Sequence, residues 1–140
     1  MTTETDRVRP RGLGRIDPVL RDSAAALDIV EFRTESLPAE RDRADRIAAE
    51  RAAAVDTSDV EIEDRVITGP GGQQLGLRLY RGPNTSAAPL ALYAHGGGFV
   101  TGNLDTDHAH CVELAREASS LVVSVDYRLA ARAPLSGGAR

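Results

Sequence analysis

The spacing of hydrophobic positions in the first third of the chain predicts two amphipathic helices. Between residues 16 and 30 apolar side chains recur near one helical face, and Asp17 followed by Pro18 provides a helix start, because aspartate caps helices and proline suits the first helical position. A second helix is expected from about residue 38 to about residue 54. Charged residues cover most of it, so this helix needs a packing partner to be stable. Its thin apolar stripe consists of Ala44, Ile47, Ala48 and Val55.

From residue 60 onward the pattern changes to short strands. Residues 60–67 predict a strand, residues 69–72 form a glycine-rich turn, and apolar positions alternate over residues 75–79, so a hairpin is expected. Residues 90–94 predict a short apolar strand. The nearly continuous apolar run at residues 121–125 is typical of a strand that is buried on both faces.

A helix is expected between the last two of these strands. Asp105 is placed to cap it, and it should run to about Ala118. Strand, glycine loop, helix and strand together make one right-handed crossover unit, which predicts a fold of the α/β class.

The loop after residue 94 carries the clearest chemical signal. Gly96, Gly97 and Gly98 follow one another, so successive main-chain amides can turn into one concavity without side-chain clashes, and such a concavity binds anions. The plain alternative is a tight turn between strand and helix. Phosphate-loop and dinucleotide-binding patterns do not match, since the chain contains no lysine and the glycine spacing differs.

The order of the motifs resembles a known family. The segments at residues 63–72, 95–105 and 125–130 stand in the order found in the hormone-sensitive-lipase-like serine carboxylesterases, and the resemblance covers about residues 15–130, the amino-terminal part of that family's domain. It implies a partial α/β-hydrolase fold with two cap helices, an antiparallel hairpin and one strand–helix–strand crossover. Whether the two helices roof an acyl pocket or are ordinary packing helices stays open.

The resemblance also assigns roles to the glycine loop. It makes Gly96, Gly97 and Gly98 the oxyanion hole, with the amides of Gly97 and Gly98 as donors to the tetrahedral intermediate. His95 would anchor the loop rather than act as a base, and residues 126–128 would brace the loop after the last strand.

None of the catalytic triad is found in the sequence. There is no G-x-S-x-G elbow, and all three histidines precede residue 111, whereas the triad order places histidine last. The resemblance implies that the intact family members bind a small-molecule ester as substrate. The chain by itself is therefore expected to carry oxyanion donors without a nucleophile or base, and to be inactive.

A cluster of possible metal ligands occurs where the third helix begins. His108 and His110 are two residues apart and cannot share a helical face, while Asp107 with Cys111 would supply only two ligands. We expect no metal and no cofactor, and we interpret Cys111 as a packing residue of the helix. The family resemblance implies that this segment borders the acyl site, which makes one of its side chains a candidate to orient the glycine loop.

Composition narrows the remaining classes. The net charge is −4 and the 17 basic residues, all arginine, are spread along the chain, which disfavours nucleic-acid binding. No apolar stretch approaches the roughly 20 residues of a membrane span. One cysteine excludes an internal disulfide and is compatible with a reducing cytoplasm, where we expect the protein. The sequence does not indicate an oligomeric state.

Four segments are expected: a disordered lead at residues 1–14, a helical cap segment at 15–56, the amino-terminal part of the hydrolase domain at 57–130, and an aberrant tail at 131–140. Where the family would continue Pro-Glu, this chain reads Ala131–Gly138, and a one-base shift near codon 131 in a GC-rich gene reproduces those residues. We hypothesise such a frameshift.

Without the family's fifth strand, residues 90–94 should form an unprotected edge strand, and the chain should be insoluble or molten. Two further hypotheses remain. The glycine loop would serve a non-catalytic ligand-binding module, or the two arginine-rich helices would serve an interaction protein.

Overall fold

The computed structural model describes residues 15–26, 35–83 and 89–130. The chain divides into two compact units, Met1–Pro38 and Ala39–Arg140, and each is described here by itself. The predicted lead at residues 1–14, the predicted end of the first helix at residues 27–30, and the predicted tail at residues 131–140 lie outside the described residues.

Among residues 15–26, the first unit has one short helical segment. A turn of 3-10 helix, η2 (Pro18–Leu20), leads directly into α1 (Arg21–Ala26). The Asp17 carboxylate accepts a hydrogen bond from the Val19 amide at 2.9 Å, so the predicted cap is confirmed.

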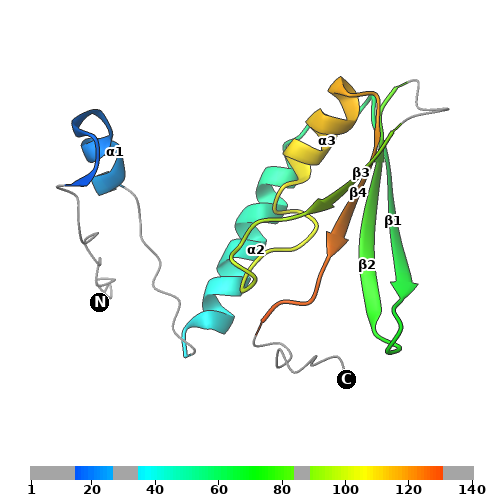
Figure 1. Ribbon diagram of the computed structural model, residues 1–140, viewed down its shortest axis with the longest axis horizontal. Coiled ribbons are helices and arrows are strands. Elements are labelled where there is room, and N and C mark those ends of the chain that lie inside the picture. The colour runs from blue at the N-terminus through cyan, green and yellow to red at the C-terminus, as the bar shows by residue number, and fades with distance from the viewer. Residues whose placement is uncertain (1–14, 27–34, 84–88, 131–140) are drawn as a thin grey trace. The chain divides into compact units, whose positions relative to one another are not determined.

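The second unit is built on a four-stranded sheet with the order β1-β2-β4-β3 (Figure 1). Strands β1 (Glu61–Thr68) and β2 (Gln74–Arg81) form the predicted antiparallel hairpin. Strand β4 (Leu121–Asp126) pairs antiparallel with β2 and parallel with β3 (Leu90–Ala94). Strand β3 therefore lies at an edge, as the sequence predicted.

Helix α3 (His108–Glu117) covers one face of the sheet and closes the main core. Its buried residues pack against Tyr80 of β2 and Val122 of β4, and Ala91 and Tyr93 of β3 join them at the margin. The cluster of buried core residues comprises Val60, Tyr80, Cys111, Val112, Ala115 and Val122. Cys111 is 1% exposed within this cluster, which confirms its predicted packing role, and burial raises the pKa of its thiol to about 11.

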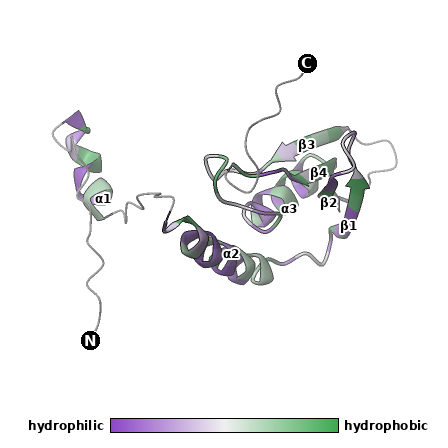
Figure 2. Cartoon of the chain, turned by 90° about the horizontal axis from the view of Figure 1, so that it is seen from below, coloured by the Kyte–Doolittle hydropathy of each residue, from purple (hydrophilic) through white to green (hydrophobic). Residues whose placement is uncertain are grey.

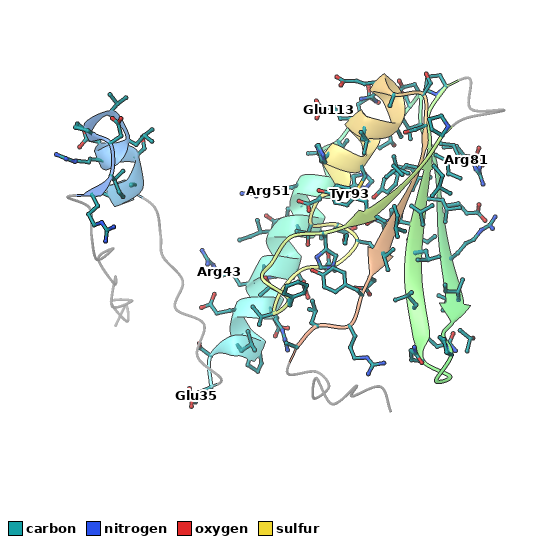
Figure 3. All side chains as sticks on the ribbon, viewed as in Figure 1. Glu35, Arg43, Arg51, Arg81, Tyr93 and Glu113 are labelled. Atoms are coloured by element: carbon teal, nitrogen blue, oxygen red, sulfur yellow. The ribbon has the colours of Figure 1, made fainter. Side chains whose placement is uncertain are left out.

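Helix α2 (Leu37–Ala53) matches the predicted second helix and lies on the same side of the sheet as α3 (Figures 1 and 2). Arg43 and Arg51 extend from it away from the sheet (Figure 3). Neither α2 nor α3 covers the opposite sheet face, where Leu90 and Leu92 are 64% and 73% exposed. Within the described residues, none of the helices has the length and apolar character needed to cross a membrane.

Candidate active site

The candidate site is the arc of main chain at residues 95–102, which follows the end of β3. The backbone has φ of 122° at Gly97, 60° at Gly98 and 63° at Phe99. The Gly97 carbonyl accepts hydrogen bonds from the amides of Val100 and Thr101, both at 3.1 Å. A Cβ atom on Gly97 would collide with the Thr101 carbonyl, so both the conformation and the close approach require glycine there.

The three glycine amides of the arc are not equivalent. The Gly96 amide donates a hydrogen bond to the Asp107 carboxylate at 3.0 Å. For the amides of Gly97 and Gly98 no acceptor is found among the described residues, and both glycines are exposed. Two adjacent donors are therefore available to an outside acceptor, and the side chain of Phe99, 70% exposed, follows them directly.

His95 is buried beneath the arc with only 4% of its surface exposed. Its Nδ1 lies 2.7 Å from the Gly96 carbonyl oxygen, which can only accept, so Nδ1 carries the proton. Tyr127 stacks on the imidazole at 4.3 Å between ring centroids and donates its hydroxyl to the His95 carbonyl at 2.7 Å. Gly102 lies so close to the ring that a Cβ atom there would collide with it. The geometry agrees with an anchoring role, and no hydrogen bond joins His95 to a serine or cysteine among the described residues.

Asp107 fixes the start of the arc from the helix side. It occupies the N-cap position of α3 but makes no side-chain capping bond, because its carboxylate accepts from the Gly96 amide and from the Tyr93 hydroxyl at 3.2 Å. Burial, followed by the negative charge of Asp107, raises the pKa of Tyr93.

Arg41 of α2 holds the other end of the arc. Its side chain is 7% exposed, and its Nε and one terminal nitrogen donate hydrogen bonds of 2.6 Å to the carbonyls of Val100 and Ala130. The Ala130 amide in turn donates to the Phe99 carbonyl at 2.7 Å. Helix α2, the arc and the segment after β4 are thus connected at one point.

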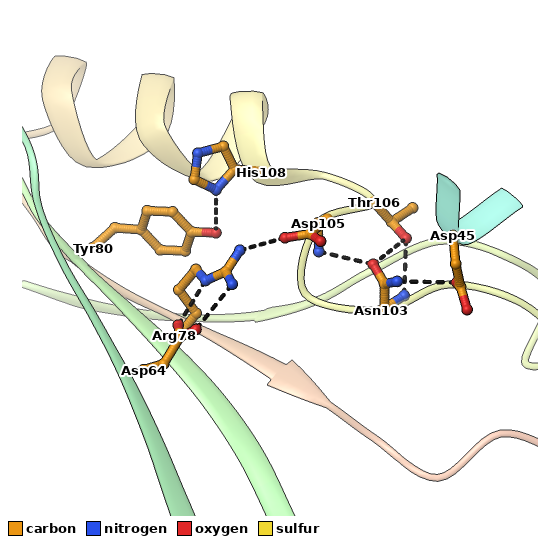
Figure 4. Close-up of polar contacts among 8 residues, drawn as sticks. All are labelled: Asp45, Asp64, Arg78, Tyr80, Asn103, Asp105, Thr106 and His108. Atoms are coloured by element: carbon orange, nitrogen blue, oxygen red, sulfur yellow. Dashed lines mark hydrogen bonds and ion pairs between the residues drawn. The ribbon is translucent and has the colours of Figure 1, made fainter. Parts of the chain in front are cut away.

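A chain of polar contacts joins the sheet to the loop between the arc and α3 (Figure 4). Arg78 donates to Asp64 and, at 2.6 Å, to Asp105, and these contacts raise the Arg78 pKa, the bond to Asp64 contributing most. Asn103 accepts from the Asp105 amide and donates to Asp45 of α2 at 3.0 Å. The loop is therefore held from both the sheet and α2.

This network corrects one expectation. Asp105 does not cap α3, which begins at His108, because its carboxylate pairs with Arg78 and its amide bonds to Asn103 in the preceding turn. Among the described residues, no group of three His, Cys, Asp or Glu side chains could hold a metal ion.

Sequence reasoning placed His95 and the three glycines together but missed Arg41 and Asn103 as residues that position the arc, and it did not single out Asp107 among the side chains at the helix start that could orient the loop. Arg41 lies 59 and 89 residues from its two partners, and no local pattern indicates contacts at that separation. Asp107 was considered as a metal ligand and, through the family resemblance, as one of several side chains that could orient the loop. Its position 11 residues after Gly96, at a helix start, was a usable signal, because carboxylates accept bonds from glycine amides.

Comparison with known proteins agrees with this architecture. Residues 91–139 match the family described as alpha/beta hydrolase fold. The chain is 38% identical over 125 residues to esterase LipI of Mycobacterium tuberculosis, which covers 85% of this chain and 37% of LipI. It is 43% identical over 72 residues to ethyl acetate hydrolase of Pseudomonas putida, covering 49% of this chain and 23% of the relative.

Among solved structures, esterase LipW from Mycobacterium marinum superposes with a TM-score of 0.75 at 40% sequence identity, and the match covers 94% of this chain and 41% of LipW. The chain thus spans less than half the length of these relatives. The chain matches the amino-terminal part of the hormone-sensitive-lipase-like esterases of the α/β-hydrolase fold, as its motifs predicted.

Proposed function

We propose that the arc binds the carbonyl oxygen of a carboxylic ester and stabilises the negative charge that develops when a nucleophile attacks the carbonyl carbon. The amides of Gly97 and Gly98 are the donors. The observation that carries this proposal is that both are exposed and have no acceptor among the described residues, while the neighbouring Gly96 amide and His95 Nδ1 are hydrogen-bonded. One such donor typically lowers the barrier by about 2.7–4 kcal/mol.

Gly96 has a different role in this scheme. Because its amide is engaged by Asp107, it fixes the direction in which the arc leaves β3 and does not bind the oxyanion itself. His95 supports the arc from below through Gly96 and Tyr127. Such preorganisation matters because donors that are already oriented cost no rearrangement at the moment of reaction.

The nucleophile and the general base are proposed to come from outside residues 1–140. In the complete reaction a serine attacks the ester carbonyl, a histidine takes its proton, and collapse of the tetrahedral intermediate gives an acyl-enzyme. No histidine in the described part of the chain hydrogen-bonds to a serine or cysteine. Accordingly, the chain alone should not hydrolyse para-nitrophenyl acetate above the background rate.

A chimera tests the proposed donors. Residues 15–130 replace the matching segment of the LipW esterase, and hydrolysis of para-nitrophenyl butyrate is measured. Gly97→Ala should lower kcat by about 10²- to 10³-fold, since the new Cβ collides with the Thr101 carbonyl and displaces the donors. Gly82→Ala is the matched control, because its Cβ collides with the Ala115 carbonyl, away from the arc.

Two results would contradict the proposal. An active chimera that keeps its kcat after Gly97→Ala would show that the arc does not bind the oxyanion. Hydrolysis by the 140-residue chain that disappears with Gly97→Ala would show that a nucleophile lies within the chain itself. Saturable ester binding without turnover by the chain would agree with the proposed division of roles.

A further inference from the structure

We propose that Arg41 is a positioning residue of the oxyanion site, which fixes the far end of the glycine arc from helix α2. The inference rests on the proposed function of Gly97 and Gly98. It is carried by the two hydrogen bonds from the Arg41 guanidinium to the carbonyls of Val100 and Ala130.

Burial makes Arg41 unusual among the arginines of α2. It is 7% exposed, whereas Arg43 projects into solvent and pairs with Glu40 at 3.8 Å. No ion pair of Arg41 with another described residue is found. A buried cation without a counter-charge is costly unless strong acceptors surround it, so the two carbonyls are what hold it in place.

The contacts of Arg41 close a ring through three segments. The Arg41 guanidinium donates to Ala130, the Ala130 amide donates to Phe99, and Val100, adjacent to Phe99, accepts from Arg41 again. Two consecutive carbonyls of the arc are thereby held from outside the arc. The planar fork of a guanidinium suits this task, because two of its N–H groups can bond to separate acceptors in fixed directions.

Phe99 explains why the arc needs this support. Its φ of 63° lies in the left-handed region that non-glycine residues rarely adopt. Such a conformation persists only where the surroundings enforce it. Without Arg41, Phe99 can return to negative φ, and the peptide units on either side of it, beginning directly after Gly98, must rotate. The donors would then no longer point toward one acceptor.

Hydrogen exchange, measured by mass spectrometry on the complete 140-residue chain at submicromolar concentration, tests whether Arg41 holds the arc and the segment after β4 together. Arg41→Gln should lower protection of the Ala130 amide by about tenfold or more, equivalent to about 1.4 kcal/mol of opening free energy. Peptides from α3 and β4 should keep their protection. Arg43→Gln, on the same helix but exposed, is the matched control and should change neither.

Arg41→Lys separates geometry from charge. A single ammonium cannot reproduce the fork, so we expect Ala130 to lose protection as in Arg41→Gln. In the LipW chimera, Arg41→Lys should lower kcat with little change in KM, because substrate binding is kept while the donors lose their orientation. If a variant of the 140-residue chain shows no protected amide at all, the kinetics of the chimera decide whether Arg41 positions the donors.

The outcomes separate the two proposals. Unchanged Ala130 protection in Arg41→Gln, or an unchanged kcat in the chimera carrying Arg41→Lys, would overturn the role of Arg41. Full recovery by lysine of both readouts would also overturn it, since charge alone would then suffice. An unchanged kcat after Gly97→Ala would instead overturn the oxyanion proposal. The positioning role of Arg41 would then be decided by hydrogen exchange at Ala130 alone.

Discussion

The hydrogen bond between Tyr80 and His108 makes the stability of the fold depend on pH. His108 is 7% exposed, and its Nδ1 lies 3.0 Å from the Tyr80 hydroxyl. Burial, reinforced by the positive charge of Arg78, lowers the pKa of His108 below its ordinary value of 6.5, while Asp105 and Asp64 oppose this shift.

The sign of the pH effect follows from the lowered pKa. Above pH 6.5 the neutral imidazole is present in both folded and unfolded chains, and its stabilisation is complete. As the pH falls below 6.5, the unfolded chain takes up the proton first, so stability decreases, by at most about 1.4 kcal/mol per pH unit for one proton.

His108→Asn should remove this contribution, because the asparagine oxygen can accept the Tyr80 hydroxyl bond but does not titrate. The measurement is the urea concentration at the unfolding midpoint, followed by circular dichroism between pH 7 and about pH 4.5. Below this range the stability also changes because Asp64, whose pKa is lowered in the folded chain, begins to titrate. His110→Asn, exposed on the same helix, is the control. Equal pH slopes for the His108 variant and the unchanged chain would contradict the assignment.

Single residues were predictable only where their role is local. The glycines at the arc and the Asp17 cap follow from neighbours in the sequence, since backbone conformation and capping act over a few residues. Arg41 could not be predicted, because a charged residue in a polar helix is normally solvated, and its acceptors are main-chain carbonyls that no side-chain pattern reveals.

The two edge strands of the sheet differ in their protection against further pairing. Strand β1 carries Glu61, Glu63, Asp64 and Arg65, and such charges disfavour association with another strand. Strand β3 carries only Leu90, Ala91, Leu92, Tyr93 and Ala94. Association should therefore begin at β3.

Leu92→Lys should reduce self-association of the chain, because it places a charge in the middle of the unprotected edge, at a side chain that is 73% exposed. Sedimentation velocity at rising protein concentration measures the effect. Val66→Lys on β1, at a side chain that is 66% exposed, is the matched control and should change association little. An equal reduction by both variants would show that charge in general, not the β3 edge, controls solubility.

Strand limits were predicted closely, and the third helix start was not. Period-two alternation and short apolar runs report strands directly, as β2 and β3 confirm. The start of α3 could not be predicted from a capping side chain, because the Asp105 carboxylate pairs with Arg78, remote in sequence, and the Asp107 carboxylate accepts from the Gly96 amide. Tertiary contacts override local capping preference in this way.

Among the described residues of the second unit, helices cover one face of the sheet and leave the other uncovered. The covered face packs under α3, with Tyr80 and Val122 fully buried. Because side chains alternate along a strand, the other face carries Leu77, Val123 and Leu92. Leu92 of β3 is paired with Val123 of β4, and Leu77 of β2 is paired with Val125, two residues further along β4. On this face Leu90 and Leu92 are exposed whereas Leu79 is 7% exposed, so the uncovered apolar surface lies toward β3. Large exposed apolar surfaces normally mark a binding site or a site of aggregation.

Residues 1–140 should consequently bind the dye 8-anilinonaphthalene-1-sulfonate and unfold over a broad temperature range. The physical reason is that packing is complete on one sheet face only, so few contacts cooperate in holding the tertiary structure. Fluorescence titration and near-ultraviolet circular dichroism measure both properties, and the LipW chimera, which supplies the remaining chain, is the control. A sharp melt of a monomer that binds no dye would contradict the expectation.

Cys111 gives the molecule a chemical reporter of its own motion. It is the only thiol of the chain, it lies 1% exposed between α3 and the sheet, and its raised pKa keeps it protonated near neutrality. An alkylating reagent can therefore react only when α3 separates from β4. At saturating reagent, the labelling rate equals the rate of this local opening. One ordinary mass spectrum per time point would record how often the hydrophobic interior of this chain becomes wet.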